Sequence, residues 1–398
     1  MTATGVVMLI ERGPRENMAD LERHWASART FAYVQEKSAA AAPWLSGIQE
    51  QIPAPYRENH FCLLTSGSTG APKLVIGRKH NSEELARVLH RVQDSEPVRE
   101  TIVSLPLTYC YAFVNQWLWS RVMHRRLVLT SGFAKAEIFR EALRRADNAM
   151  ICLVGPQAAL LRNMFGAERF PGVIRLHFAG GRFPQEQLPA LREMFPNAAI
   201  FNNYGCAEAL PRLTLRRAED GDAASDIGSP LPGVHLKSGP AGELLFRSPY
   251  RSVAQLDSHG FRQIAPHEWI PNGDLVRYEG NGRWQLVGRA GEVFKRYGEK
   301  IALQQVISTV NRQWSGQIGY YREKDAAGED GYVLLLSPQP SEENLRGLMR
   351  VFRSSHPRTH WPLRIESAAV LPLNSNGKVD SLAAQSMEHR SLLWRQRI

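Results

Sequence analysis

The chain has 398 residues, of which 43% are hydrophobic and 22% are charged, so it is too apolar for a disordered tail and long enough for two or more domains. Lys and Arg number 49 against 39 Asp and Glu, and the formal charge of +10 favours anionic partners such as nucleotides, coenzyme A, acidic proteins or nucleic acid. The 4 cysteines lie far apart without a CxxC pair, which argues against a disulfide framework and a structural zinc site and favours the reduced cytoplasm. No stretch approaches the roughly 18 apolar residues of a spanning helix, so we expect no membrane span.

The first half of the chain alternates short apolar segments with segments of helical periodicity. Strands are predicted over residues 60–65, 101–107, 125–132, 149–155 and 173–181, and helices over 82–93, 136–146 and 185–195. Strand, turn and helix in succession indicate an α/β domain with a largely parallel, buried sheet.

The second half of the chain has a different character. After Asp226, short segments broken by Gly, Pro and Asn predict hairpins or a small barrel. From about Ala290 onward, helices predicted over 303–314 and 341–355 alternate with strands over 331–338 and 364–372, which indicates a smaller α+β unit. We place the boundary near Arg289, in a polar stretch that contains Gly, so the expected domains are residues 1–289 and 290–398.

A run rich in hydroxyl groups and glycine follows the first of these predicted strands. It reads Thr65-Ser66-Gly67-Ser68-Thr69-Gly70-Ala71-Pro72-Lys73. Glycine lets backbone N–H groups turn toward a ligand, and the hydroxyls and the lysine ammonium supply further donors, so this composition suits a loop that cradles an anion. No GK[ST] follows the first glycine at the required spacing, which excludes a Walker A loop.

The run TSGSTGAPK resembles the phosphate-loop signature of the adenylate-forming superfamily, which includes acyl- and aryl-CoA synthetases, carrier-protein ligases and the adenylation domains of peptide synthetases. Further motifs of that superfamily follow in the same order. They are AGG at 179–181, NYGCAE at 203–208 for YGxTE, GSPLPG at 228–233, NGD at 272–274 for TGD, GRAGEVFKRYGEKI at 288–301 for the hinge motif GRxDxxIKxxGxxI, and PLNSNGK at 372–378 for PxTxxGK. Because the order holds over about residues 60 to 380, the chain is identified as a compact member with a shortened N-terminal region.

The resemblance implies an α/β fold. It consists of a large N-terminal AMP-binding domain of stacked, mostly parallel sheets with helices and a small β-rich subdomain, followed by a small mobile α+β domain. In this superfamily the small domain rotates about the hinge between two half-reactions. It would present Lys378 for the first, and the thiol-transfer face with Lys295 and Gly298 for the second.

The resemblance also implies chemistry. A carboxylate attacks the α-phosphate of ATP to give an acyl-AMP and pyrophosphate, and a thiol then takes the acyl group. Because two anions meet in the first step, catalysis is mainly positioning and charge neutralisation. Lys378 would contact the carboxylate and the α-phosphate, and Glu208 would hold Mg²⁺. The remaining nucleotide-binding positions would be Thr65, Ser66, Gly67, Ser68, Thr69, Gly70 and Lys73 along the pyrophosphate path, Gly180, Gly181 and Gly205 in turns, Tyr204 at adenine, and Asp274 and Arg289 at the ribose.

The acid pocket is assigned to the segment LPLTYCYAF at 105–113, which matches a region like LPLxHxYGL with Tyr109 in place of the gate histidine. Amino-acid-activating relatives carry an Asp nearby, whereas TYCYAFVNQWLW has no acidic residue, which disfavours an α-amino acid. A planar aryl acid suits the aromatic and small residues here, although a core role fits each aromatic equally well. The expected pocket residues are Tyr109, Cys110, Tyr111, Cys206 and Ala207.

The thiol acceptor stays open between coenzyme A and the phosphopantetheine of an acyl or aryl carrier protein. Both acceptors are anionic and fit the positive charge of the chain. The shortened N-terminal region favours a dedicated carrier-protein ligase. The expected partners are therefore a small carboxylic acid and an acidic carrier protein.

Several positions depart from the superfamily pattern. Ala207 replaces a Thr, Gly291 replaces the hinge Asp, Asp380 stands where Arg or Lys is frequent, and the region before Thr65 is short. They leave an alternative, a degenerate non-catalytic nucleotide-binding protein of the same fold. Losing one hydrogen bond to a charged group costs about 1.5–3 kcal/mol, which slows an enzyme without abolishing it. Nucleic-acid binding is not expected, because Lys and Arg are scattered without a recognition motif.

Overall fold

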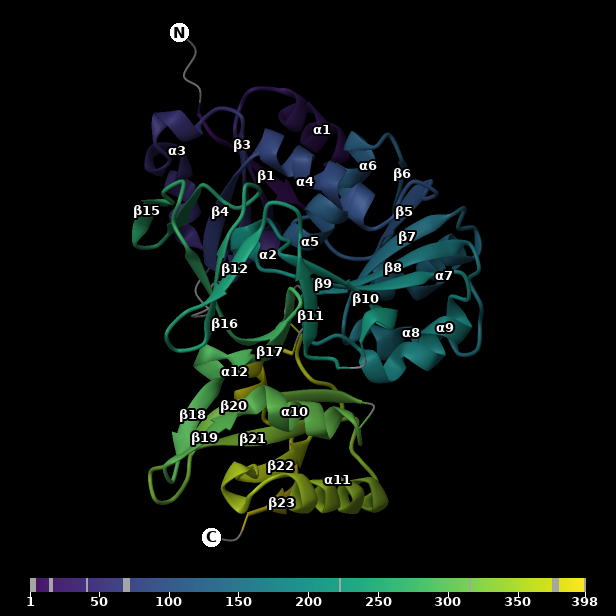
Figure 1. Cartoon of the computed structure of the whole chain (residues 1–398), viewed down its shortest axis with the longest axis vertical. Coiled ribbons are helices and arrows are strands. Elements are labelled where there is room, and N and C mark those ends of the chain that lie inside the picture. Colours follow the sequence, from purple (N-terminus) through teal and green to yellow (C-terminus); the bar gives the residue numbers. More distant parts are fainter. Residues whose placement is uncertain are drawn as a thin grey trace. The chain divides into compact units, whose positions relative to one another are not determined.

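The computed structural model describes residues 5–13, 17–40, 42–66, 72–221, 223–314, 316–373 and 379–396. The chain divides into two compact units (Figure 1). Unit 1 comprises Met1–Gly239, Leu244–Asn272 and Tyr278–Gln285, and unit 2 comprises Pro240–Glu243, Gly273–Arg277 and Leu286–Ile398. No helix in these described ranges is long and apolar enough to cross a membrane.

Two sheets organise unit 1, and the second also includes residues of unit 2. The first has the order β1-β2-β3-β4-β14-β15 and consists of β1 (Val7–Glu11), β2 (Phe31–Gln35), β3 (His60–Ser66), β4 (Pro72–Arg78), β14 (Ala254–Asp257) and β15 (Gly260–Gln263). The second has the order β12-β13-β16-β17-β11-β10-β9-β8-β7-β5-β6 and consists of β5 (Glu100–Val103), β6 (Arg126–Leu129), β7 (Ala149–Val154), β8 (Val173–Ala179), β9 (Ala199–Tyr204), β10 (Thr214–Arg217), β11 (Asp226–Pro230), β12 (His235–Ser238), β13 (Glu243–Arg247), β16 (Ile270–Gly280) and β17 (Arg283–Arg289). Parts of the strands β13, β16 and β17 of the second sheet belong to the residues of unit 2. Parallel pairing links β1 to β2 and β2 to β3 in the first sheet. In the second sheet it links β6 to β5, β5 to β7, β7 to β8 and β8 to β9.

A layer of helices lies between the two sheets (Figure 1). It contains α1 (Met18–Ala26), α4 (Lys79–Val92) and a continuous helical run over 110–122, made of α5 (Cys110–Ala112), the π-helical stretch Phe113–Leu118 and α6 (Trp119–Val122). The Phe113 ring stacks on Phe61 of β3 at 5.3 Å between centroids, and the Gln116 amide donates to Thr101 Oγ1 of β5 at 2.9 Å. The helical run therefore contacts both sheets.

The outer faces of the sheets are also covered. On the second sheet, α7 (Ala136–Arg144), α8 (Gln157–Phe165) and α9 (Leu188–Met194) bury Phe139, Leu161 and Leu191 against the strands. On the first sheet, α3 (Ile48–Gln51) and the turn before it bury Ile48 and Leu45, and α2 (Glu36–Ala40) lies beside them. The predicted strands and helices of this half are present, and the α/β fold class is confirmed.

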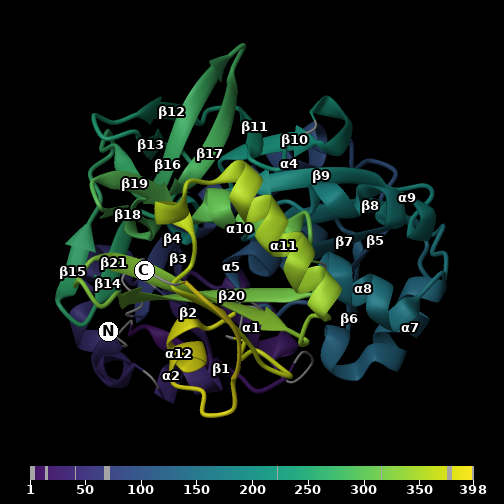
Figure 2. The same cartoon turned by 90° about the horizontal axis from the view of Figure 1, so that it is seen from below.

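Unit 2 contains a hairpin and a small sheet. The hairpin joins β18 (Val293–Arg296) to β19 (Glu299–Ala302), and the sheet has the order β20 (Gln317–Lys324), β21 (Asp330–Ser337), β22 (Arg364–Ser367) and β23 (Ser391–Arg395). Helices α10 (Leu303–Asn311) and α11 (Glu342–Ser355) cover one face of this sheet, where Leu334 of β21 packs against them (Figure 2). The next residue, Leu335, lies on the opposite face and packs with α12 (Ser381–Gln385). This is the small α+β unit that the sequence predicts, while the exact division at Arg289 stays a prediction.

Candidate active site

The predicted phosphate loop joins two antiparallel strands of unit 1. Thr65 at the end of β3 pairs with Lys73 at the start of β4. Gly67, Ser68, Thr69 and Gly70 lie outside the described residues. The hairpin thus places the hydroxyl of Thr65 and the ammonium of Lys73 on neighbouring strands at the base of this loop.

Lys73 and Glu208, which the sequence assigns to pyrophosphate and to Mg²⁺, meet in the structure. The Lys73 ammonium forms an ion pair with the Glu208 carboxylate, and their side chains are only 17% and 16% exposed. Glu208 lies in a turn directly after β9, and its carbonyl accepts hydrogen bonds from the backbone N–H and the hydroxyl of Ser252, both at 2.9 Å. Segments more than a hundred residues apart in the sequence therefore bring an anion and a cation to one point.

The electrostatics of this pair keep Glu208 ionised. Burial by itself would raise the pKa of Glu208, but the Lys73 charge and the hydrogen bonds from Lys73 and Cys206 outweigh it and lower the pKa below its ordinary 4.5. Glu208 thus offers a charged, hard oxygen ligand, which is the donor type that Mg²⁺ prefers. No group of three or more His, Cys, Asp or Glu that could hold a metal ion exists in the part of the chain that the structure describes. Such a cluster is not needed, since Mg²⁺ is often held by one carboxylate, waters and the phosphates of a nucleotide.

The ion pair should make stability depend on pH. In the wild type the pKa of Glu208 is lowered, so the stabilisation is complete above 4.5 and is lost as the pH falls through the folded-state pKa. Lys73→Met removes the counter-charge but leaves Glu208 buried, so burial then raises the pKa of Glu208. In this variant stability is lost as the pH increases, which is the opposite of the wild type. We expect Lys73→Met to cost about 3–5 kcal/mol near neutrality, the range for breaking a buried ion pair.

Thermal unfolding of both proteins across the acidic and neutral range measures this effect. The difference in Tm between the wild type and Lys73→Met should be largest at neutral pH and should decrease as the pH falls. Lys135→Met, at an exposed lysine after β6, is the matched control and should leave the Tm unchanged. A gap for Lys73→Met that stays constant with pH would contradict the assignment.

The predicted adenine residue Tyr204 closes β9. Its hydroxyl accepts a hydrogen bond from the Asn272 amide at 2.7 Å. The next residue, Gly205, lies against the carbonyl oxygen of Pro211, where a Cβ atom would collide with backbone. Gly205 is therefore required by packing, independently of any nucleotide.

Gly205 and Gly181 form a matched pair for mutagenesis. Gly205→Ala should destabilise the protein by about 1–3 kcal/mol, the usual cost of overpacking. A Cβ atom added at Gly181 would have no neighbour within 4 Å, so Gly181→Ala should keep the wild-type stability. Since the resemblance places Gly181 against the ligand, Gly181→Ala should nevertheless lower turnover. Urea unfolding and pyrophosphate release separate the two effects, and full activity of Gly181→Ala would contradict its assignment.

The predicted acid-pocket residues lie around the start of the helical run. The Tyr109 hydroxyl lies against Gly180 at the end of β8, where it would collide with a Cβ atom, and the Tyr109 ring packs edge-on to Tyr111 at 6.2 Å between centroids. Cys110 is buried, and burial raises the pKa of its thiol, so it is no nucleophile. Cys206 and Ala207 lie at the turn that carries Glu208.

A polar network behind Tyr111 was not predicted from the sequence. Arg212 donates to Asn115 Oδ1 at 2.6 Å and to Asn203 Oδ1 at 2.8 Å. The Asn203 amide donates to the Tyr111 hydroxyl at 2.9 Å and lies 3.2 Å from His177 Nδ1. The available sequence signal is the lone arginine within the apolar stretch ALPRLTL at 209–215.

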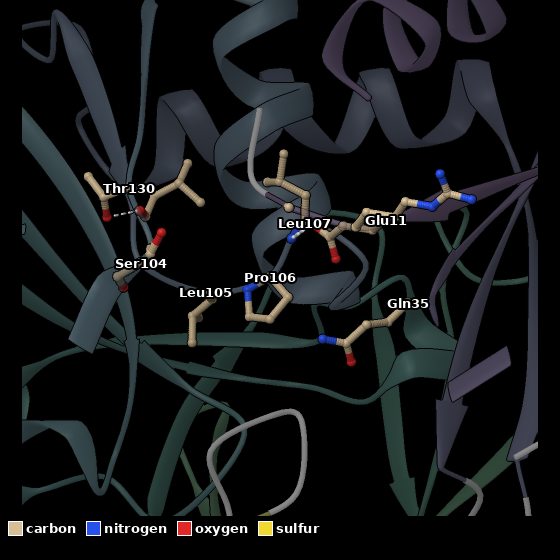
Figure 3. A pocket seen from close by; sticks show the side chains of 11 residues that line it. Glu11, Gln35, Ser104, Leu105, Pro106, Leu107 and Thr130 are labelled. Carbon is tan, nitrogen blue, oxygen red and sulfur yellow. Dashed lines mark hydrogen bonds between the residues drawn. The ribbon is translucent and has the colours of Figure 1, made fainter. Parts of the chain in front are cut away.

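A cavity of about 200 Å³ opens where strands of both sheets end (Figure 3). One carboxylate oxygen of the buried Glu11 accepts from the Leu107 backbone N–H at 3.1 Å, and the other accepts from the Thr108 hydroxyl at 2.6 Å. Glu11 therefore anchors the segment that leads to Tyr109. The cavity is lined by Glu11, Arg12, Gly13, Gln35, Val103, Ser104, Leu105, Pro106, Leu107, Thr130 and Ser131, and not by the predicted acid-pocket residues.

Unit 2 holds the remaining predicted residues. Asp274 is nearly buried and accepts a hydrogen bond from Arg289 Nε at 3.0 Å, so the two predicted ribose contacts are paired. Lys295 is an exposed residue of β18, between the buried Phe294 and Arg296. Gly298 follows in the hairpin turn with a φ of 82°, a conformation that favours glycine. Lys378 lies outside the described residues.

Comparison with known proteins identifies the family. The family model described as AMP-binding enzyme matches residues 4–251, which is more than half of the chain. The chain belongs to the AMP-binding enzyme family. The match also confirms the resemblance to the adenylate-forming superfamily that the motifs indicate.

Curated relatives of this AMP-binding enzyme are distant in sequence. The non-ribosomal peptide synthetase CmlP of Streptomyces venezuelae is 24% identical over 344 residues, which cover 82% of this chain and 34% of that protein. The D-alanine–D-alanyl carrier protein ligase of Bacillus licheniformis is 22% identical over 387 residues, covering 84% of this chain and 72% of that protein. The chain spans only 34% of CmlP and 48% of triostin synthetase I of Streptomyces triostinicus.

Solved structures share the fold. The o-succinylbenzoate CoA synthetase of Bacillus subtilis, in complex with the acyl-adenylate intermediate, aligns with a TM-score of 0.75 at 15% identity over 98% of this chain and 89% of that chain. The anthranilate CoA ligase AuaEII, in complex with anthranoyl-AMP, aligns with a TM-score of 0.72 at 17% identity over 92% of this chain and 80% of that chain. At these identities the likeness establishes the fold of the AMP-binding enzyme.

Proposed function

We propose that this AMP-binding enzyme converts a carboxylic acid into an acyl-AMP with ATP and then transfers the acyl group to a phosphopantetheine thiol. The Lys73–Glu208 ion pair carries the proposal. It places a charged carboxylate beside a lysine at the base of the predicted phosphate loop. A bound nucleoside triphosphate with its Mg²⁺ needs both groups here, an oxygen ligand for the metal and a cation for the phosphates.

The residues of unit 1 would act as follows. Bound Mg²⁺ would neutralise phosphate charge, with Glu208 as its protein ligand. Once released from Glu208, the Lys73 ammonium would donate hydrogen bonds to the departing pyrophosphate, and the Thr65 hydroxyl would do the same. Tyr204, whose hydroxyl is fixed by Asn272, would offer its ring to adenine.

The residues of unit 2 would complete the reaction. Asp274, held by Arg289, would accept hydrogen bonds from the ribose hydroxyls. Lys378 would contact the acid carboxylate and the α-phosphate in the first half-reaction. The face with Lys295 and Gly298 would serve thiol transfer in the second, after a rotation of residues 290–398 about the hinge.

The acid is proposed to lack an α-amino group. The segment 105–119 has no acidic side chain, and the buried guanidinium of Arg212 lies behind Tyr111, where a positive charge would repel an ammonium. Tyr109 and Tyr111 favour a planar aryl acid. The acceptor is proposed to be an acyl or aryl carrier protein, with coenzyme A as the competing acceptor.

A pyrophosphate-release screen tests the proposal. The purified chain is incubated with ATP, Mg²⁺ and benzoic, cinnamic, aliphatic or amino acids, and acyl-AMP is identified by mass spectrometry. Release should require ATP, Mg²⁺ and a non-amino acid. Radiolabelled acid with either coenzyme A or a carrier protein then identifies the acceptor. ATP binding by calorimetry without adenylate from any acid would favour the non-catalytic alternative.

A further inference from the structure

Arg212 is a buried cation without an anionic partner among the described residues. Its side chain is 1% exposed, and its guanidinium donates to the neutral amide oxygens of Asn115 and Asn203. Arg296 is just as buried but forms an ion pair with Asp325 at 3.2 Å. Buried charges in proteins are normally paired, so the neutral partners of Arg212 call for an explanation.

The charge of Arg212 persists at neutral pH. Burial lowers its pKa to about 10, which still leaves the guanidinium protonated at pH 7. Within the described part of the chain no carboxylate forms an ion pair with it, and the groups that interact with it electrostatically are the Tyr111 hydroxyl and the Cys152 thiol, whose own pKa values are raised by burial. The network therefore carries a net positive charge.

The imidazole of His177, a second group of this network, has an N–H without a hydrogen-bond acceptor among the described residues. Asn203 donates to His177 Nδ1, so the proton of the neutral imidazole lies on Nε2. That Nε2 is buried and has no hydrogen-bond partner among the described residues, and the same holds for Arg212 Nε. Both are donors, and both belong to one network. Arg296 also has a buried Nε without an acceptor among the described residues, so what sets this network apart is that two such donors, Arg212 Nε and His177 Nε2, occur in it together with an uncompensated charge. A ligand that brings acceptor oxygens would satisfy both donors.

The network lies directly behind the predicted acid pocket. Tyr111, a predicted pocket residue, accepts from Asn203, and Asn203 immediately precedes Tyr204. Tyr109 packs against Tyr111 and lies over Gly180, two residues from Phe178 and three from His177 in β8. An acid bound beside Tyr109 and Tyr111 would thus lie next to the network that contains Arg212 and His177.

We propose that the acid substrate carries a second carboxylate, which Arg212 binds with His177 as an additional donor. This inference rests on the proposed function and names its substrate class, a dicarboxylic acid. One carboxylate is adenylated, and the other remains ionised and supplies the missing counter-charge. A guanidinium and a carboxylate match in charge and in fork geometry, which makes Arg212 a specificity determinant rather than a group that reacts.

Matched acid pairs test the proposal. The kcat/KM for ATP-dependent pyrophosphate release is measured with benzoate against isophthalate, and with hexanoate against adipate. The wild type should prefer the diacid of at least one pair by about 10⁴-fold or more, because a site built for a hydrogen-bonding group rejects the analogue that lacks it. Arg212→Gln should lower kcat/KM chiefly for the diacid and so remove the preference. Arg212→Lys, which keeps the positive charge, should retain part of it.

Two further variants keep the test decisive if Arg212→Gln fails to fold. Asn203→Asp supplies an internal carboxylate to Arg212, so the diacid preference should disappear in a stable protein. Arg216→Gln removes another buried arginine, which bonds Gln185 and the Gly221 carbonyl, and it should leave the ratio between diacid and monoacid unchanged.

The outcomes separate this inference from the proposed function. Turnover of monoacids with no diacid preference in the wild type, or an equal loss on both acids in Arg212→Gln, would overturn the role of Arg212 and leave the adenylation proposal intact. Absence of ATP-dependent turnover with every acid would overturn the adenylation proposal, and this inference with it.

Discussion

Glu208→Gln should reduce the rate of acyl-AMP formation by about 10²–10³-fold, the usual cost of removing one group that stabilises transition-state charge. Glutamine keeps the shape of the side chain but removes the charge that would bind Mg²⁺. It also leaves Lys73 without its ion-pair partner, so the free protein is altered as well. Pyrophosphate release at several Mg²⁺ concentrations should therefore show a raised metal requirement in addition to a lower kcat.

The control for Glu208→Gln must separate chemistry from folding. Glu219→Gln replaces a carboxylate that pairs with Arg192 at the exposed surface, and it should leave both kcat and the metal requirement unchanged. Urea unfolding of both variants shows how much of any loss comes from stability. If Glu208→Gln keeps the wild-type kcat and metal dependence, Glu208 is not the metal ligand.

Lys378→Ala should separate the two half-reactions. The lysine of the PLNSNGK motif would neutralise charge between the acid and the α-phosphate, so its loss should reduce acyl-AMP formation by about 10²–10³-fold. Transfer from chemically prepared acyl-AMP to the thiol does not need this contact and should stay near the wild-type rate. Lys295→Ala should show the reverse pattern, because Lys295 belongs to the proposed thiol-transfer face.

Separate assays of each half-reaction test this expectation. Acyl-AMP formation is followed by pyrophosphate release, and thiol transfer by consumption of supplied acyl-AMP in the presence of each acceptor. Lys324→Ala, at an exposed position of β20, serves as the control and should affect neither. Equal loss of both half-reactions in Lys378→Ala would contradict a role confined to the first.

Much of the fold can be predicted from the sequence because the signals are local. The apolar segments of β3, β7 and β8 and the periodic helices α4 and α11 have short-range patterns, and each forms where it is expected. The pairing between strands is less local. Parallel neighbours occur in β1–β3 and β5–β9, whereas hairpins such as β3–β4 and β14–β15 add antiparallel pairs to the same sheets. Motif order assigns Lys73 and Glu208 to one site, which stays a prediction, and the structure joins their side chains in an ion pair.

The rest of the site depends on contacts that no local pattern reveals. Glu11 reaches Leu107 and Thr108 from the first strand of unit 1, and Arg212 reaches Asn115 across almost a hundred residues of sequence. Only the packing of the helical run between the two sheets brings these residues together. The same packing decides that Tyr109 lies over Gly180, which the substitution of the gate histidine alone cannot indicate.

The helical run over 110–122 also limits how the acid preference of this enzyme can change. Its first turn contains the predicted pocket residues Cys110 and Tyr111, whereas Phe113 and Trp117 pack against Trp25 and Phe61 in the core. A substitution in the first turn alters what the pocket can accommodate, while one turn later it disturbs aromatic packing on which both sheets depend. Substitutions that change the acid preference, in evolution or in protein engineering, are therefore confined to the first turn of this helical run, and the middle of the run must stay intact.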